Sequence, residues 1–317
     1  MRGAWWMALL FLPGLLSDCG CRPEEKKPRP LRLFLAAGLT PWVDSLREEC
    51  LSEKGIELWA EASGSQTACR KVTELGRSCD LLLLADNDLV TTLLKGTCRW
   101  RIDFALDEVV IAVGARAPRV SDAEADWTAV LRAEGVRLGR VDENLGPMGY
   151  RTLLVWKLAE ARGARGLAEA ISQRTVKIVD DVSRLAPLLR QGEIDYAFVY
   201  RSLCAAQDLR FIELDRAVNL GSDDVDYSSA EVSYQKLAAG PEETITVRGA
   251  PIVWTLTAPE EGADKALAAE FVEYALTRRA QKLVSNGLRP IVPPRFYGTA
   301  EDFEPFGGFA ERRGPLK

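Results

Sequence analysis

The chain has 317 residues, of which 47% are hydrophobic and 27% charged; these proportions are typical of a soluble globular protein with room for two domains. The net charge of −5 argues against a nucleic-acid-binding surface. The absence of histidine excludes histidine-based nucleophile pairs and zinc sites and removes the commonest general base. We therefore expect a binding protein and not an enzyme.

The N-terminal segment has the pattern of an export signal. Arg2 precedes an apolar run over residues 4–16, which is too short to span a bilayer but suits the core of a signal peptide. The run leads to Asp18-Cys19-Gly20-Cys21, which resembles a bacterial lipobox, where a cysteine after small residues is acylated. Cys19 is favoured as the acylated residue, with Cys21 as the alternative; an ordinary secretory peptide with incidental cysteines is a further possibility.

These features divide the N-terminus into a signal peptide over residues 1–18 and a proline-containing tether over residues 19–30. We expect an exported protein of the bacterial periplasm or cell envelope, anchored to the membrane by lipid. Five further cysteines would then meet an oxidising compartment, and up to two disulfides are possible among them, with Cys204 as the candidate free thiol. These cysteines are Cys50, Cys69, Cys79, Cys98 and Cys204.

From residue 31 onward, strand and helix patterns alternate. Apolar runs predict strands over residues 31–36, 56–62 and 81–84, and amphipathic runs predict helices over residues 42–53, 66–75 and up to 94. Thr40 and Pro41 are suitable N-cap and first-turn residues for the first helix. A longer strand over residues 104–113 then leads into the segment 114–118, where we expect the chain to leave the first lobe.

A second alternating unit follows. Its predicted strands cover residues 136–141, 176–178 and 196–200, and its helices 127–133, 151–162 and 184–190. Extended segments over 231–236 and 244–248 come next. A strand over 251–257 then returns to the first lobe, which two helices over 263–278 and 280–286 complete before the tail after Pro293. The pattern predicts a doubly wound α/β fold, with lobe I over 31–113 and 250–317 and lobe II over 114–249.

Four loops combine small residues with helix starts. In the segment 61–67, Ser65 stands where an N-cap would, so its hydroxyl and the free amides of the next helix converge on one point, as in anion sites. The loops 37–40, 146–149 and 181–183 have the same character. All four lie at the carboxyl ends of predicted strands, where open α/β sheets bind ligands. One such loop is ordinary backbone geometry, but four facing one cleft predict an anion site.

The motifs of both lobes resemble one known family. They are 61–65 (EASGS), 68–76 (ACRKVTELG), Asp80 with 85–86, 101–105 (RIDFA), 146–151 (GPMGYR), 192–202 (GEIDYAFVYRS) and 251–253 (PIV). Together, in this order over residues 31–293, they resemble the tungstate- and molybdate-binding proteins of ABC importers, closest to the archaeal-type branch. The resemblance implies a two-lobed periplasmic-binding-protein fold (type II, Venus-flytrap), in which each lobe is a doubly wound mixed sheet flanked by helices.

The same resemblance implies the function. A monomeric receptor would capture molybdate or tungstate between its lobes, without a cofactor, and deliver it to a permease and its ATPase. Carried over by position, Ser65 donates its hydroxyl and amide, Met148 and Val182 donate backbone amides, and Tyr200 donates its hydroxyl. In the first loop, either the amide of Gly38 or the hydroxyl of Thr40 replaces the usual serine.

Two positions depart from the archaeal-type pattern. Gly146 and Val199 stand where that branch has carboxylates that enter the metal's coordination sphere. We therefore expect no direct protein–metal ligand and a plain tetrahedral anion held by neutral donors. Such a site should select little between molybdate and tungstate, and the proton of phosphate would need an acceptor that this donor set lacks.

Two other functions remain open from the sequence. The same fold could receive another small oxyanion or an organic anion, although no arginine is clearly aimed at the cleft to bind a carboxylate as a fork. Alternatively, the protein is an exported sensor or interaction module without transport. Asp86 is expected as a helix N-cap, and Asp142 and Glu143 are expected to point outward.

Overall fold

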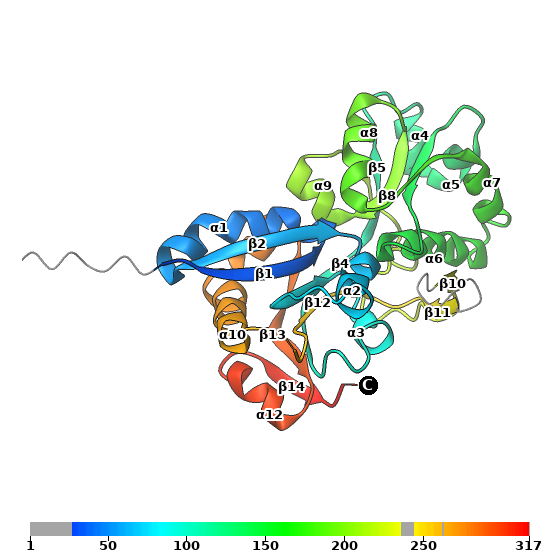
Figure 1. The fold of residues 1–317 in the computed structure, drawn as a ribbon. Helices are drawn as coiled ribbons and strands as arrows, with labels where there is room; N and C mark the ends of the chain where they lie inside the picture. Colours follow the sequence, from blue (N-terminus) through cyan, green and yellow to red (C-terminus); the bar gives the residue numbers. More distant parts are fainter. Residues whose placement is uncertain (1–26, 236–243, 262, 317) are drawn as a thin grey trace, which may run out of the picture.

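The computed structural model describes residues 27–235, 244–261 and 263–316. The signal peptide over 1–18, Cys19, Cys21 and most of the tether lie outside these described residues. Figure 1 shows two bodies side by side, each built on its own sheet with helices against it. We call the seven-stranded sheet with its helices the first lobe, and the five-stranded sheet with its helices the second lobe.

The first-lobe sheet mixes parallel and antiparallel strands. Its order is β14 (Glu311–Gly314), β13 (Arg289–Tyr297), β4 (Arg101–Asp107), β12 (Ile252–Thr257), β3 (Leu81–Leu84), β1 (Arg29–Ala36) and β2 (Ile56–Ser63). β1 runs parallel to both β2 and β3, whereas β12 is antiparallel to its two neighbours. The four leucines of β3 are fully buried, as expected for a central strand covered on both faces.

Helices begin directly at the carboxyl ends of the parallel strands. The helical segments of this lobe are η1 (Ala37–Leu39), α1 (Thr40–Lys54), α2 (Ser65–Thr73), α3 (Leu89–Thr92), α10 (Lys265–Glu273), η3 (Tyr274–Arg278), α11 (Gln281–Ser285), α12 (Ala300–Phe303) and η4 (Glu304–Phe306). α1 ends at Gly55, whose φ of 63° is a left-handed helix end that glycine adopts without strain. Thr40 is the first residue of α1 and not its cap, because the chain enters that helix through η1.

The second-lobe sheet has five strands. Its order is β7 (Thr175–Val179), β6 (Leu138–Val141), β8 (Tyr196–Tyr200), β5 (Val109–Val113) and β9 (Phe211–Ile212). Its helices are α4 (Val120–Ala125), α5 (Trp127–Arg132), α6 (Pro147–Ala161), α7 (Leu167–Arg174), η2 (Val182–Arg184), α8 (Leu185–Gln191) and α9 (Arg201–Gln207). A separate antiparallel pair of strands, β10 (Glu231–Gln235) and β11 (Thr244–Arg248), packs on α6, where Tyr234 stacks on Tyr150 with ring centroids 5.4 Å apart.

The chain passes between the lobes earlier than the sequence predicts. The single strand expected over 104–113 is two strands, because β4 belongs to the first sheet and β5 to the second. At the junction, the buried Asp107 accepts a hydrogen bond from Ser202 Oγ of the second lobe (2.5 Å) and from Trp254 Nε1 of the first (3.2 Å). The expected lobe boundary after Val113 is therefore wrong; the crossing lies at Asp107–Glu108.

The C-terminal tail adds strands to the first-lobe sheet. β13 continues past Pro293 to Tyr297, and β14 pairs with it in parallel. The pairing of β13 with β4 shifts register between Pro290 and Arg295, and such an irregularity tolerates the missing N–H groups of proline.

The five described cysteines are free and buried, so the structure contains neither of the two disulfides that the sequence allows. Cys69, Cys79 and Cys98 belong to one small apolar cluster. Burial is the first cause that raises the pKa of each of these three thiols, which keeps them protonated and unreactive.

Candidate functional site

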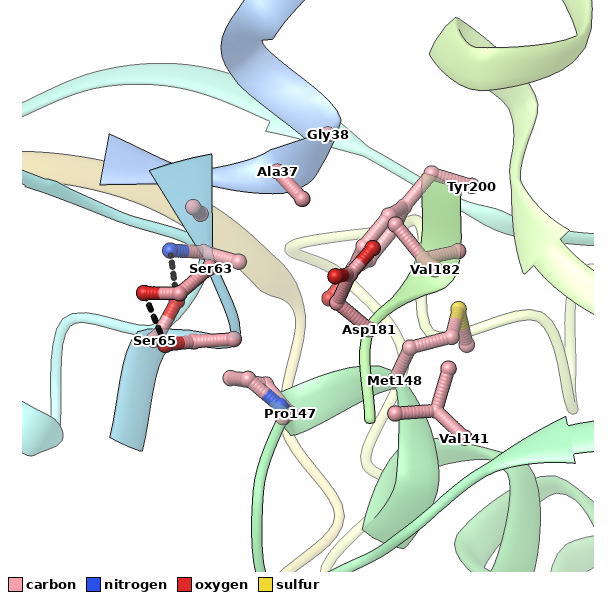
Figure 2. A pocket seen from close by; sticks show the side chains of 14 residues that line it. Ala37, Gly38, Ser63, Ser65, Val141, Pro147, Met148, Asp181, Val182 and Tyr200 are labelled. Atoms are coloured by element: carbon pink, nitrogen blue, oxygen red, sulfur yellow. Dashed lines mark hydrogen bonds between the residues drawn. The ribbon is translucent and has the colours of Figure 1, made fainter. Parts of the chain in front are cut away.

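A cavity lies between the two lobes, and Figure 2 shows the side chains around it. The space that the centre of a water-sized sphere can occupy is about 20 Å³, little more than the roughly 10–15 Å³ that one water molecule requires. The lining residues are Ala36, Ala37, Gly38, Ser63, Gly64, Ser65, Ala85, Val141, Gly146, Pro147, Met148, Asp181, Val182 and Tyr200. The size and the prevalence of small residues suit a small ion.

Four helical segments begin at this cavity. The first residues of η1, α2, α6 and η2 are Ala37, Ser65, Pro147 and Val182, and all four line it. The first N–H groups of a helix have no partner within the helix, and the helix dipole places partial positive charge there. Two starts come from each lobe, so backbone donors point at one volume from both sides, which is a favourable environment for an anion.

Ser65 is not the N-cap that its position in the sequence predicts. Ser65 is the first residue of α2, and Gly64 is the N-cap. Ser65 Oγ instead accepts a hydrogen bond from the backbone N–H of Ala85, 3.0 Å away. Because the hydroxyl oxygen already accepts there, its own hydrogen is free to donate elsewhere. Ser65 is fully buried and lines the cavity, so this hydrogen is available to a ligand.

Tyr200 closes the cavity on the second-lobe side. It is the last residue of β8 and is 2% exposed. Burial raises the pKa of its phenol to about 12, so it stays protonated as a donor. Gly38 lies close by, since a Cβ at this position would lie 2.9 Å from the ring of Trp254 and 3.5 Å from that of Tyr200. A glycine is therefore needed for the first loop to approach these rings.

The structure brings together five of the six residues that the sequence predicts as ligands. Gly38, Ser65, Met148, Val182 and Tyr200 all line the cavity. Thr40 does not, because it lies one turn further along the helical segment that starts at Ala37.

Of the two positions where the archaeal-type branch has carboxylates, one lines the cavity and the other does not. Gly146 lines the cavity. Val199 is absent from the lining and is fully buried, because it precedes Tyr200 on β8 and successive strand residues point to opposite faces. Val199 is therefore a core residue, whereas Gly146 stands at the cavity wall; that neither position supplies a ligand to the metal stays a prediction.

Sequence reasoning missed the one charged residue among the described lining residues, which is Asp181. It is the N-cap of η2, and its Oδ1 accepts from the backbone N–H of Ser183 at 2.9 Å. Figure 2 shows its carboxylate among the side chains around the cavity. The expectation that no acceptor is present at the site is therefore wrong.

The lobes contact each other around the cavity. Gln66 Nε2 and an Arg70 guanidinium nitrogen of α2 donate to the backbone oxygens of Glu143 and Asn144, each at 2.9 Å. A Cβ at Gly64 would lie 2.1 Å from the backbone oxygen of Leu145, which shows how closely the two backbones approach. The conformation is thus a closed one.

Other expectations about charged residues meet mixed outcomes. The expectation that Asp86 is a helix N-cap is wrong, because Asp88 holds that position before α3. Asp86 instead accepts from the backbone N–H of Asp88 at 2.9 Å and from the Tyr150 hydroxyl across the lobe interface. Glu143 pairs with Arg140 at 2.5 Å, and Asp142 accepts from the backbone of Asn144 at 2.8 Å.

Within the described ranges, no cluster of three or more His, Cys, Asp or Glu residues is arranged to hold a metal ion. In that same part of the chain, none of the helices combines the length and apolar character that crossing a membrane requires.

Comparison with known proteins decides the family. Residues 31–287 match the family described as bacterial extracellular solute-binding protein. The chain belongs to this family. This family consists of extracellular solute-binding proteins of transport systems and is not an enzyme family.

Several members and structural neighbours of this solute-binding family carry informative names. The molybdate/tungstate-binding protein WtpA of Pyrococcus abyssi is 27% identical over 332 residues, covering 93% of this chain and 94% of the relative. A putative ABC transporter molybdenum-binding protein of Haloferax volcanii is 32% identical over 304 residues, covering 94% and 87%. The solved periplasmic molybdate-binding protein of Azotobacter vinelandii has a TM-score of 0.59 at 17% identity, covering 83% and 99%. The last likeness supports the two-lobed fold.

Proposed function

We propose that this protein is the receptor of an ABC importer and captures a tetrahedral oxyanion, molybdate or tungstate, between its lobes. The observation that carries the proposal is the set of donors around one small cavity. Helix starts supply backbone N–H groups from both lobes, and the Ser65 and Tyr200 hydroxyls add two more donors. Hydrogen bonds to a charged acceptor are about twice as strong as neutral ones, so such a cage favours a desolvated dianion.

The proposal assigns one role to each cavity residue that the sequence nominated. Ser65 donates its hydroxyl and its amide, Met148 and Val182 donate backbone amides, Tyr200 donates its phenol, and Gly38 contributes through its backbone. Molybdate and tungstate have the same charge and shape, so neutral donors select little between them. The names of the relatives support the same pair of ligands.

Calorimetric titration of the purified protein tests this function. Molybdate and tungstate should each release or absorb heat with one site per chain and raise the melting temperature, because a ligand that binds only the folded state stabilises it. Sulfate and phosphate serve as comparison anions and should bind more weakly. Neither heat nor a thermal shift with molybdate and tungstate would exclude the proposed ligands.

We further propose that the receptor acts as a monomer, tethered outside the cytoplasm through acylated Cys19, and passes the anion to a permease and ATPase. The lipobox-like segment supports the tether. Membrane fractionation should find the wild type and Cys21→Ala bound and Cys19→Ala released. Release of Cys21→Ala instead would move the anchor to that residue.

Asp181 gives a prediction about charge at the same site. Asp181→Asn removes a negative charge beside the anion and keeps a good N-cap, so affinity for molybdate should rise by roughly 1 kcal/mol, or about fivefold. Asp180→Asn is the matched control: its side chain is 53% exposed, pairs with Arg184 at 2.6 Å and is absent from the cavity lining. Equal titration results for the two variants would show that the Asp181 charge does not act on the ligand.

A further inference from the structure

Arg151 is a buried cation directly behind the cavity. It lies on α6, is 4% exposed and does not itself line the cavity. Arginine is almost never fully buried unless it is paired. Here its terminal nitrogen Nη1 donates to Tyr200 Oη at 2.9 Å and to the backbone oxygen of Ala85 at 2.5 Å. Nη2 lies 3.5 Å from Asp86 Oδ2.

The contact with Tyr200 determines which way the phenol can donate. A guanidinium has only donors, so the Tyr200 oxygen must accept from Arg151. A phenol has a single hydrogen, and this hydrogen must therefore point away from Arg151. Tyr200 lines the cavity. When an anion is bound there, the phenol hydrogen can point at it and find an acceptor.

One residue, Ala85, connects to both hydroxyls of the site, directly to that of Ser65 and through Arg151 to that of Tyr200. The N–H of Ala85 donates to Ser65 Oγ, and the C=O of Ala85 accepts from Arg151. Ala85 directly follows β3 of the first lobe, whereas Arg151 and Tyr200 belong to the second. The Arg151–Tyr200 bond therefore lies within the second lobe, whereas the Arg151–Ala85 bond forms only when the lobes are closed, so the guanidinium that orients Tyr200 is also a contact of the closed form.

The neighbours of Arg151 keep its guanidinium protonated. Burial opposes the charged form, but Tyr200, Asp86 and Tyr150 together raise the pKa of the guanidinium above its usual value. Asp86 also accepts from the Tyr150 hydroxyl. The guanidinium therefore remains a permanent donor, and its nearest ion-pair partner is Asp86 and not the ligand.

We infer that Arg151 is a positioning residue that fixes Tyr200 as a hydrogen-bond donor to the captured anion and that, in the closed form, is itself held by the first lobe through Ala85. This inference rests on the proposed function, because it assigns a role in oxyanion capture. It also explains why no arginine is needed as a direct ligand: the cationic group acts through a neutral hydroxyl.

A double-mutant cycle measured by calorimetry with molybdate tests the inference. Tyr200→Phe should weaken binding about tenfold or more, since a donor to a charged oxygen is lost. Arg151→Met should weaken binding about tenfold in the presence of Tyr200 but less than about threefold in the Tyr200→Phe background, because its effect passes through the hydroxyl. An equal loss in both backgrounds would overturn the inference and leave Arg151 as a structural contact between the lobes.

Two further variants separate positioning from closure. Tyr150→Phe removes a contact with Asp86 in the same network and leaves the Arg151–Tyr200 bond, so its effect should be the same in the wild-type and Tyr200→Phe backgrounds. Arg151→Lys keeps a positive charge beside Asp86 and should recover part of the affinity that Arg151→Met loses. If Arg151→Met does not fold, the cycle is run with Arg151→Lys, where independence from Tyr200 would equally overturn the inference.

The titration of the wild type distinguishes a failure of the proposed function from a failure of the role assigned to Arg151. A wild type that binds neither molybdate nor tungstate refutes the proposed function, and the cycle is then run with whichever of sulfate or phosphate it binds. A wild type that binds molybdate combined with an additive cycle refutes only the role of Arg151.

Discussion

Replacing Gly64 with alanine is expected to lower the affinity for molybdate by roughly a hundredfold or more while both lobes remain folded. An added Cβ would lie 2.1 Å from the backbone oxygen of Leu145 and 3.3 Å from that of Asp180, both in the second lobe. These are backbone atoms, so no side chain can rotate to relieve the clash. Raising the closed state by about 3 kcal/mol reduces the competent population, and with it the apparent affinity, by about two powers of ten.

The measurement combines titration calorimetry with small-angle X-ray scattering at saturating anion. The variant should remain more extended than the liganded wild type, and its ligand-free melting temperature should be unchanged because the clash arises only on closure. Gly308→Ala is the control, since no atom lies within 4 Å of a Cβ at that glycine. Wild-type affinity in Gly64→Ala would mean that binding does not require this approach of the two backbones.

The convergence of the cavity loops could be predicted because it follows from topology. β1 and β2 run parallel, and the loop after each of them carries Gly38 or Ser65. Loops at the carboxyl ends of parallel strands meet at one edge of the sheet, so small residues and helix starts in these loops predict a shared site from the sequence alone. The corresponding loops of the second lobe, at Met148 and Val182, follow the same rule.

Contacts between distant segments could not be predicted in this way. The sequence predicts that Ser65 caps its own helix, whereas its hydroxyl accepts from the backbone N–H of Ala85, a residue that follows a different strand. Arg151 lies inside a helix whose buried face covers most of its length, so helical periodicity alone does not show that it reaches Tyr200. The break at Glu108 carries no glycine or proline signal; it is set by the donors from both lobes that hold Asp107.

Replacing Ser65 with alanine is expected to affect both binding and stability. The anion would lose a donor to a charged oxygen, which costs roughly 1.5–3 kcal/mol, or about 10- to 150-fold in affinity. In addition, the N–H of Ala85 would lose its acceptor in a buried position, and an unsatisfied buried group costs roughly 1–3 kcal/mol of folding free energy. Calorimetric titration and urea unfolding of the ligand-free protein measure the two effects separately.

Ser63→Ala is the matched control for this prediction, because Ser63 lines the same cavity from the end of β2, two residues before Ser65. Its Oγ accepts from Lys71 Nζ at 2.9 Å and donates to the backbone oxygen of Gly64 at 3.3 Å, so its hydrogen is already engaged. Affinity should therefore change little in Ser63→Ala and fall strongly in Ser65→Ala. The opposite order would transfer the ligand role from Ser65 to Ser63, and an unchanged affinity in both would leave the backbone amides and Tyr200 as the principal donors.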